Sequence, residues 1–353
     1  MPGNGRGYKY RDRYRLRYRL LRLTVLYIAV AAAASFAVLF ALNGHAEALA
    51  AQKAEPTATA VPTATPATTP SPYAYTITGV PKDTMELYFS YNGKYLAYRT
   101  GAGITVMDTG ANTTLKTIED PGIQWMRFIE NREIVLYITM EGNTVAVSTY
   151  NIQSGAQARQ ASITVPANSK VKSAAFSSMR NYLCVDVQTG TDSFSDEVYT
   201  VDIMKRTARL TLQDVINNLV LTRRTNQVYY TNSKGILYLG DKALNDAGEG
   251  KLLGPDGKDR MYFQSAADRS AISVIADGKR ESSISLPNVA NLVLFYRTDS
   301  TLYAVFDGYL VDLSGDVDVQ VPFDKGLDFA GIGGKNVFFR NAAGDMLGIE
   351  MLS

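Results

Sequence analysis

Two groups of carboxylates have a spacing that could support chemistry in this 353-residue chain. Asp192, Asp196 and Glu197 lie within one short segment, and Asp316 and Asp318 stand two residues apart. Carboxylate oxygens are the ligands that Ca²⁺ prefers, and paired carboxylates also serve glycoside cleavage. Neither spacing matches a known calcium loop, so we interpret these acids as solvated residues of turns.

The other residue types used in catalysis are scarce. The only histidine, His45, falls outside the segment that we expect to fold, which excludes Ser-His-Asp, Cys-His and His-ligated metal sites from the folded domain. The only cysteine, Cys184, lies in an alternating segment and is predicted to pack as a small apolar side chain. We therefore predict no catalytic, cofactor-binding or metal-binding residues.

Tyrosine is abundant, with 22 residues, and could supply a binding surface. Exposed tyrosines around a central channel would form a platform for a sugar or a peptide. Trp125, the only tryptophan, begins a predicted inner strand and is expected in the core. Four tyrosines at strand positions are predicted to pack instead: Tyr95, Tyr98, Tyr229 and Tyr230.

The elements that would position these residues are short β-strands. From Tyr73 onward, segments rich in Val, Ile, Tyr, Thr and Phe alternate with Gly, Asn, Asp or Ser every 6 to 12 residues. Four such strands recur with a period near 40, which predicts an all-β propeller of seven blades, with six or eight as alternatives. Only Leu212–Leu221 admits a helical interpretation.

The ends of the domain predict how the ring closes. The last unit, from Leu327, contains only three strands before the chain ends. Tyr73–Thr78 is a spare strand at the opposite end of the domain. We predict that this segment pairs with the last unit as its fourth strand, because an unpaired edge strand invites aggregation.

One blade carries a family resemblance. The segment Phe89–Tyr98, followed by Ile104–Gly110, resembles the strand-turn-strand signature of Tol-type and WD-repeat-like bacterial propellers. The usual Pro-Asp before the glycine is here Tyr91-Asn92. The resemblance implies propeller blades over Tyr73–Ser353 and does not specify a function, because this fold supports scaffolds, binders and enzymes.

The N-terminal segment predicts a membrane location. Eight Lys and Arg residues lie between Arg6 and Arg22 against one acid, and Leu23–Leu42 carries no charge. Twenty residues at about 1.5 Å each span roughly 30 Å, the thickness of the bilayer hydrocarbon. Lys and Arg stay on the cytoplasmic side during insertion, so we predict a single-pass type II protein. The residues assigned to topology and anionic lipid are Arg11, Arg13, Arg15, Arg17, Arg19 and Arg22.

A cleaved signal peptide is the alternative for this segment. Ala46-Glu47-Ala48 has the small-x-small pattern that a signal peptidase accepts. Signal-peptide cores run about 7–15 residues, and this apolar segment is longer, which favours an anchor.

We divide the chain into a basic cytoplasmic tail (1–22), a transmembrane helix (23–43), a juxtamembrane segment and Pro/Thr-rich linker (44–72), and an extracytoplasmic β-propeller (73–353). The linker holds five prolines and six threonines between Ala51 and Pro72, so it is predicted to stay extended and disordered. The propeller carries 27 Lys and Arg against 31 Asp and Glu, so no nucleic-acid partner is expected. A domain without disulfides suits a bacterial envelope.

These observations favour a membrane-anchored, extracytoplasmic scaffold or protein–protein interaction module of the cell envelope. Its expected partners are the membrane, anionic lipid at the basic tail and an envelope protein. The alternative is a domain that binds or cleaves cell-wall carbohydrate through Tyr, Asp and Glu. A third hypothesis is signal transfer from the outer domain to the basic tail.

Overall fold

The computed structural model describes residues 73, 75–177, 182–190, 195–212, 215–286, 289–298, 300–314 and 320–351. Across these ranges, no helix combines the length and apolarity that a membrane crossing requires. The predicted cytoplasmic tail, transmembrane helix and linker lie outside the described residues, as do His45, Asp192, Asp316 and Asp318.

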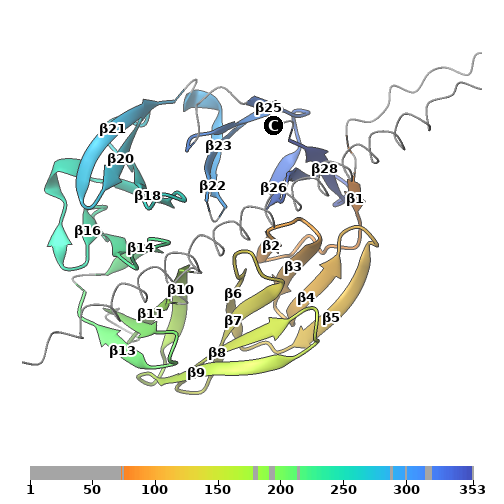
Figure 1. The fold of residues 1–353 in the computed structure, drawn as a ribbon, viewed down its shortest axis with the longest axis horizontal. Helices are drawn as coiled ribbons and strands as arrows, with labels where there is room; N and C mark the ends of the chain where they lie inside the picture. Colours follow the sequence, from red (N-terminus) through yellow and green to blue (C-terminus); the bar gives the residue numbers. More distant parts are fainter. Residues whose placement is uncertain are drawn as a thin grey trace, which may run out of the picture. The chain divides into compact units, whose positions relative to one another are not determined.

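Seven four-stranded sheets stand around a common axis as the blades of a propeller (Figure 1). The prediction of an all-β propeller with seven blades is confirmed. Blade 1 contains β2 (Glu86–Phe89), β3 (Tyr95–Thr100), β4 (Gly103–Asp108) and β5 (Thr113–Glu119). Blade 2 contains β6 (Ile123–Phe128), β7 (Ile134–Glu141), β8 (Thr144–Asn151) and β9 (Gln157–Thr164). Blade 3 contains β10 (Lys170–Ser177), β11 (Tyr182–Thr189), β12 (Ser195–Val201) and β13 (Thr207–Leu210).

Blades 4 to 7 follow the same order from the axis outward. Blade 4 contains β14 (Ile216–Leu221), β15 (Val228–Asn232), β16 (Leu237–Leu239) and β17 (Lys242–Ala243), and blade 5 contains β18 (Gly250–Pro255), β19 (Met261–Ser265), β20 (Ala271–Ala276) and β21 (Lys279–Ser285). Blade 6 contains β22 (Leu292–Arg297), β23 (Leu302–Phe306), β24 (Tyr309–Asp312) and β25 (Gln320–Pro322). Blade 7 contains β26 (Asp328–Gly333), β27 (Asn336–Arg340), β28 (Met346–Glu350) and β1 (Tyr75–Ile77). Two 3₁₀ turns, η1 (Asn245–Ala247) and η2 (Val289–Asn291), connect blades.

The ring closes as predicted from the ends of the domain. Strand β1 pairs antiparallel with β28, with Thr76 opposite Leu347, and supplies the outer strand of blade 7. The Tyr73 hydroxyl also donates a 2.7 Å hydrogen bond to Asp324 in the segment before β26. The first and last strands therefore share one sheet, which removes a free edge.

The segment Leu212–Leu221, for which a helix was the alternative to a strand, forms no helix over its described residues. Residues 216–221 form β14, the inner strand of blade 4, which pairs with β15. Leu219 and Leu221 pack in the core between blades 3 and 4. The local sequence pattern does not distinguish a helix from a strand in this segment. Pairing with β15 and packing against blade 3 favour the strand.

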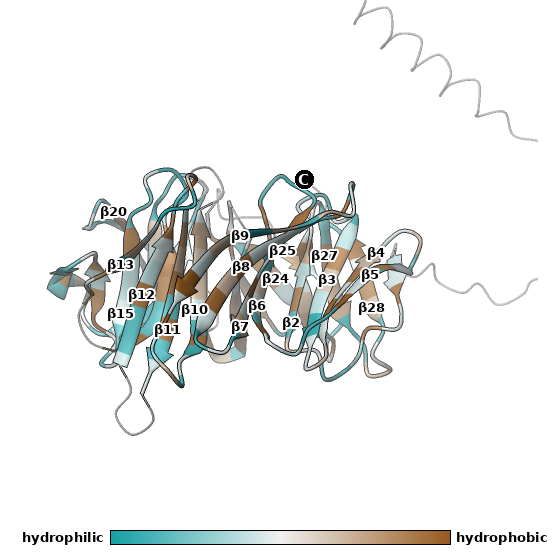
Figure 2. Cartoon of the chain, turned by 90° about the horizontal axis from the view of Figure 1, so that it is seen from below, coloured by the Kyte–Doolittle hydropathy of each residue, from teal (hydrophilic) through white to brown (hydrophobic). Residues whose placement is uncertain are grey.

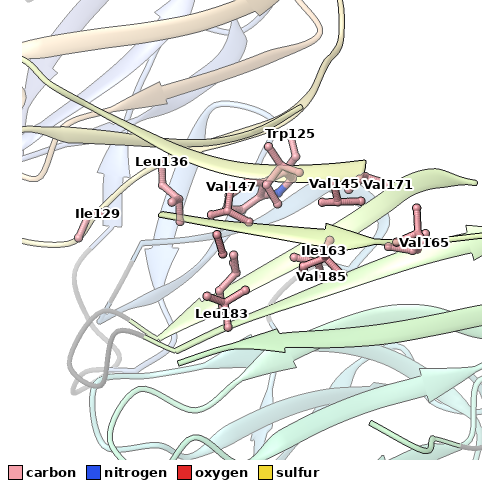
Figure 3. Close-up of a cluster of buried hydrophobic side chains, with 14 residues drawn as sticks. Trp125, Ile129, Leu136, Val145, Val147, Ile163, Val165, Val171, Leu183 and Val185 are labelled. Atoms are coloured by element: carbon pink, nitrogen blue, oxygen red, sulfur yellow. The ribbon is translucent and has the colours of Figure 1, made fainter. Parts of the chain in front are cut away.

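The cores lie between neighbouring blades, where apolar side chains alternate along the strands (Figure 2). Figure 3 shows the cluster between blades 2 and 3, to which Trp125 and Val147 contribute from one blade and Val185 from the other. The predictions that Trp125, Cys184 and the four tyrosines pack inside are confirmed. Each is at most 9% exposed, and burial raises the pKa of Cys184 to about 12.

The inner strands share a feature that the sequence analysis did not reveal. In blades 2 to 7, each inner strand carries one extra residue that shifts its register against the second strand. Such β-bulges bend a strand and redirect a side chain. The extra residues are Gln124, Lys172, Asn217, Leu253, Val293 and Ala330.

Polar side chains near these bulges join successive blades. Glu86 accepts a hydrogen bond from Met126 N at 3.1 Å, and Gln124 accepts one from Val171 N at 2.7 Å. Asn218 donates to the Leu252 carbonyl at 2.7 Å. The inner strands of blades 1, 2 and 4 thereby satisfy a backbone group of the next blade, which ties these neighbouring blades together.

Candidate functional site

The seven inner strands run in the same direction, so the loops that join the first and second strands gather on one face. We call this face the AB face; it includes residues 90–94 of blade 1 and 129–133 of blade 2. The loops that join the third and fourth strands turn back on the same face, because successive strands are antiparallel. The opposite face carries the starts of the inner strands, such as Met85 before β2.

A cavity of about 340 Å³ opens on the AB face where the inner strands end. We call it the axial pocket. Its walls come from blades 6, 7, 1 and 2, and its volume lies within the range of roughly 300–1,000 Å³ that is usual for ligand sites. The polar and aromatic residues that line it include Tyr88, Arg127, Glu130, Tyr296, Arg297 and Tyr303.

Three of these side chains occupy one structural position in three different blades. Tyr88, Arg127 and Tyr296 are each the penultimate residue of an inner strand, paired with the second strand one step before the loop. Because successive blades are rotated about the axis, the same register brings all three to the same cavity. One structural position, repeated in three blades, thus supplies three of the residues that line the pocket.

Arg297 reaches the pocket across a glycine of the neighbouring blade. A Cβ atom at Gly254 would lie 2.6 Å from Cδ of Arg297, so a larger residue there would displace the arginine. Gly254 follows the bulge of β18 and has a φ of +122°, a conformation that residues with a Cβ rarely adopt. The bulge and the glycine together make room for Arg297.

A third arginine, from the far side of the ring, contacts the lining residue Glu130. Arg223 of blade 4 pairs with Glu130 of blade 2, and its Nε donates a 2.7 Å hydrogen bond to Oε2. The carboxylate is 7% exposed, so this is a largely buried, two-armed ion pair. A Cβ atom at Gly257 of blade 5 would stand 3.3 Å from the same guanidinium. Arg223 therefore connects blades that are not neighbours in the ring.

The backbone of Arg223 is held by an aspartate of the next blade. Asp259 accepts hydrogen bonds from the backbone N–H groups of Arg223 at 2.6 Å, Arg224 at 3.0 Å and Thr225 at 3.1 Å. Hydrogen bonds from three successive N–H groups to one carboxylate are charge-assisted and restrain the backbone of the loop. The blade 4 loop is therefore rigid before any ligand arrives.

The pocket presents more positive than negative charge among its described lining residues. Arg127 and Arg297 contribute two cations, and Glu130 contributes one acid that is paired with Arg223. Burial raises the pKa of Tyr88, while the positive charges of Arg127 and Arg297 oppose that rise. Such a site can hold a polar or anionic group against aromatic walls.

The carboxylates singled out in the sequence do not line this pocket. Asp196 accepts hydrogen bonds from Lys172 Nζ at 2.7 Å and from Ile216 N at 2.6 Å, and its side chain is fully buried. Glu197 pairs with Arg209 at 2.9 Å. Across the described residues, no group of three His, Cys, Asp or Glu side chains could hold a metal ion. The interpretation of Asp196 and Glu197 as solvated residues of a turn is wrong, because both lie in β12 and their carboxylates are held by cations of blade 3.

A carboxylate that the sequence analysis overlooked lies beside Asp196. Asp186 is 1% exposed, accepts a hydrogen bond from Ser173 at 3.3 Å, and leaves Oδ1 without a partner in the described part of the chain. Burial, reinforced by the neighbouring charge of Asp196, raises the pKa of Asp186 to about 7. We call Asp186, Asp196, Lys172 and Ser173 the acid cluster; it lies at the junction of blades 3 and 4.

The pocket residues could have been found only by aligning the blades. Tyr88-Phe89, Arg127-Phe128 and Tyr296-Arg297 each end an inner strand, but only the pairing register shows that they are equivalent. The first two pairs share a phenylalanine, and that is the one signal that the sequence offers. Tyr88, Tyr91, Tyr296 and Tyr303 line the pocket, whereas the four tyrosines that were predicted to pack do not.

Comparisons with known proteins yield fold-level similarity alone. No family model and no curated protein matches this chain. Among solved structures, Kluyveromyces lactis Hsv2 with complete loop 6CD is 11% identical, with a TM-score of 0.47 over 73% of this chain and 90% of that one. The AfRom2 CNH domain is 10% identical, with a TM-score of 0.45 over 77% and 95%. Similarity at this level gives no information about a ligand or a partner.

Proposed function

We propose that this chain is a membrane-anchored, extracytoplasmic scaffold or interaction module of the cell envelope, and that its AB face binds a partner protein. The axial pocket carries the proposal. It combines two arginines and four tyrosines with a preformed wall, and arginine and tyrosine are enriched where proteins bind each other tightly. The resemblance of blade 1 to Tol-type and WD-repeat-like propellers belongs to the same proposal.

An exposed aromatic residue beside the pocket supports a macromolecular ligand. Tyr91 lines the pocket and is 46% exposed in the blade 1 loop, where it can contact a partner that covers the opening. Aromatic rings at the edge of a cavity contribute contact area with little loss of side-chain entropy.

The location in the envelope is supported by the sequence of the first 72 residues. The basic residues from Arg11 to Arg22 precede an uncharged segment long enough to span a bilayer. In this arrangement the propeller stands outside the membrane at the end of the Pro/Thr linker, and the arginines contact anionic lipid on the inner side.

Photo-crosslinking from the AB face tests the partner. Benzoylphenylalanine is placed at position 91 in the full-length chain and, as a matched control, at position 85. Met85 precedes β2 and is 61% exposed. Tyr91 follows the same strand and is 46% exposed, so the two residues lie on opposite faces of the propeller. We expect a discrete high-mass adduct in intact source cells from position 91 alone. Equal adducts from both positions, or none, would contradict the proposal.

Labelling of a single introduced cysteine tests the location. Cys184 is fully buried, so Ser154→Cys in an exposed loop of blade 2 provides the reactive thiol of the described domain. We expect a membrane-impermeant maleimide to label Ser154→Cys in intact cells, and the unsubstituted chain to stay unlabelled. Labelling that requires lysis would place the propeller inside and reject the predicted topology.

Cell-wall glycan binding is the second candidate, supported by the four tyrosines in the pocket. Cleavage has less support, because two carboxylates must flank the bond and the described lining holds only Glu130, which is paired with Arg223. Wall polymers that compete with the position 91 adduct would favour this candidate over a protein partner.

A further inference from the structure

The hairpin that ends blade 3 on the AB face displays two apolar side chains to solvent. Ile203 and Met204 are 64% and 70% exposed, the latter the highest value among the exposed large apolar residues. They lie in the turn between β12 and β13, where polar residues and glycine are usual. The equivalent turns contain Thr109-Gly110 in blade 1 and Asp277-Gly278 in blade 5.

The turn is rigid, so the two side chains are displayed in a defined geometry. Asp202 accepts hydrogen bonds from the backbone N of Arg206 at 2.9 Å and from its Nε at 2.7 Å. The backbone N–H of Lys205 bonds to the Asp202 carbonyl at 2.9 Å. These contacts also hold the pKa of Asp202 below its ordinary value, with the hydrogen bond from the Arg206 side chain as the main cause.

A groove of about 250 Å³ lies next to this turn, between blades 2 and 3. Its floor includes Ile129, Leu136 and Leu183, which belong to the core cluster and are labelled in Figure 3. Ile203 forms part of its wall. The volume falls below the roughly 300 Å³ at which small-molecule sites begin, so the groove suits one apolar side chain of a larger partner.

The charges around the groove indicate what flanks that side chain. Arg132 and Lys205 both line it, and neither forms an ion pair with a described residue. The only acid among its described lining residues is Asp202, which is paired with Arg206. The groove therefore presents an apolar floor with an uncompensated positive rim, whereas the propeller as a whole has a slight excess of acids.

We propose that Ile203, Met204 and the adjoining groove bind a partner polypeptide segment in which an apolar side chain is flanked by acidic residues. The inference rests on the proposed function, in which a partner protein approaches the AB face. The apolar anchor fills the groove, Ile203 and Met204 pack beside it, and Arg132 and Lys205 contact the acidic flanks. Charge complementarity at such a rim increases the association rate and selects the partner.

Binding of a model peptide to the full-length protein in zwitterionic nanodiscs tests the proposal. The probe is a fluorescein-labelled, end-capped hexapeptide with a Leu-Phe centre and two glutamates on each side. We expect anisotropy to show saturable binding that weakens at least about tenfold in the Ile203→Ser, Met204→Ser double variant. Arg132→Gln with Lys205→Gln is expected to weaken binding several-fold and to reduce its salt dependence.

Two controls distinguish this groove from a nonspecific apolar surface. Met85→Ser removes an apolar residue of similar exposure on the opposite face and should leave binding unchanged. Peptides with glutamine in place of glutamate, or with serine in place of Leu-Phe, should bind at least about tenfold more weakly. Equal binding of these peptides, or an equal loss in Met85→Ser, would overturn the proposal.

Other occupants of the surface give different results. If the double variant abolishes self-association of the full-length chain in sedimentation, a second copy occupies the groove. If it abolishes binding to anionic vesicles but leaves peptide binding intact, the ligand is lipid. Either result overturns the peptide proposal. A position 91 adduct without peptide binding rejects this inference alone, whereas loss of the adduct rejects the proposed function itself.

Discussion

The two ends of blade 3 differ in what they bury and what they expose. Where blade 3 meets blade 4, the acid cluster places Asp186, Asp196 and Lys172 among backbone groups, and the side chain of Asp196 is fully buried. On the AB face the same blade exposes Ile203 and Met204. Both ends depart from the usual distribution, in which charge faces water and apolar side chains are inside.

The difference separates residues that hold the fold from residues that we propose meet a partner. Burial of charge is costly unless partners are supplied, and Asp196 receives Lys172 and the Ile216 backbone. No comparable compensation exists for an exposed Ile203 and Met204 within the described chain. Substitutions in the acid cluster should therefore change stability, and substitutions in the turn should change binding.

The largest effect is expected for Asp196→Ala. This change removes the acceptor of both Lys172 Nζ and Ile216 N, and breaking a buried charged pair costs about 3–5 kcal/mol. Urea unfolding of the full chain, followed by the fluorescence of Trp125, gives the free energy of unfolding. Asp196→Asn retains an acceptor for Ile216 N and should lose less. A loss under about 1 kcal/mol for alanine would show that the cluster does not stabilise the junction.

A smaller effect, of opposite sign, is expected for Asp186→Asn. Above neutral pH this substitution should increase the free energy of unfolding. The pKa of Asp186 rises from 3.8 to about 7 on folding, so the folded state holds an extra proton between these values. The contribution of Asp186 to stability is fully present below about pH 4 and is lost as pH rises toward 7. The groups that face it are Asp196, Lys172 and Ser173.

Asparagine mimics the protonated acid, because it is neutral and its carbonyl can accept the hydrogen bond from Ser173. We expect Asp186→Asn to be more stable than the unsubstituted chain by about 1–3 kcal/mol at pH 8 and to match it at pH 4. Urea unfolding at several pH values measures the difference. A difference that does not depend on pH would mean that Asp186 keeps its ordinary pKa.

The smallest effect on stability is expected for Ile203→Ser with Met204→Ser. Surface substitutions away from the core change the free energy of unfolding by about 0.5 kcal/mol or less. The same urea experiment measures this value alongside the binding assay. If the double variant lost 2 kcal/mol or more, the turn would belong to the core, and the contrast between the two ends of blade 3 would not hold.

The fold was accessible from the sequence, because a propeller repeats a local pattern. Strand alternation and turn residues predicted the blades, and the missing fourth strand after Leu327 predicted closure by the segment that contains β1. Burial of Trp125, Cys184 and Tyr229 followed from the same alternation. In each case the information lies within a few residues, so no long-range contact is needed to infer it.

The candidate sites were not accessible in this way. Tyr88, Arg127 and Tyr296 are far apart in the chain and meet only because seven blades close into a ring. The acid cluster was half recognised, since Asp196 was noted but Asp186 was not, because their proximity depends on the pairing of β11 with β12. The exposure of Ile203 and Met204 depends on the turn that Asp202 and Arg206 hold.

The sequence by itself predicted the fold class, seven blades with six or eight as alternatives, and the closing strand, because these depend on local alternation and on a count of strands. It also predicts the division of the chain into a basic tail, an apolar segment, a linker and a folded domain. The tertiary structure alone decided which polar groups meet at the axis, which acids are buried together and which apolar side chains stay exposed. Those outcomes depend on register, on bulges in the inner strands and on ring closure, all of which act between residues that are distant in the chain.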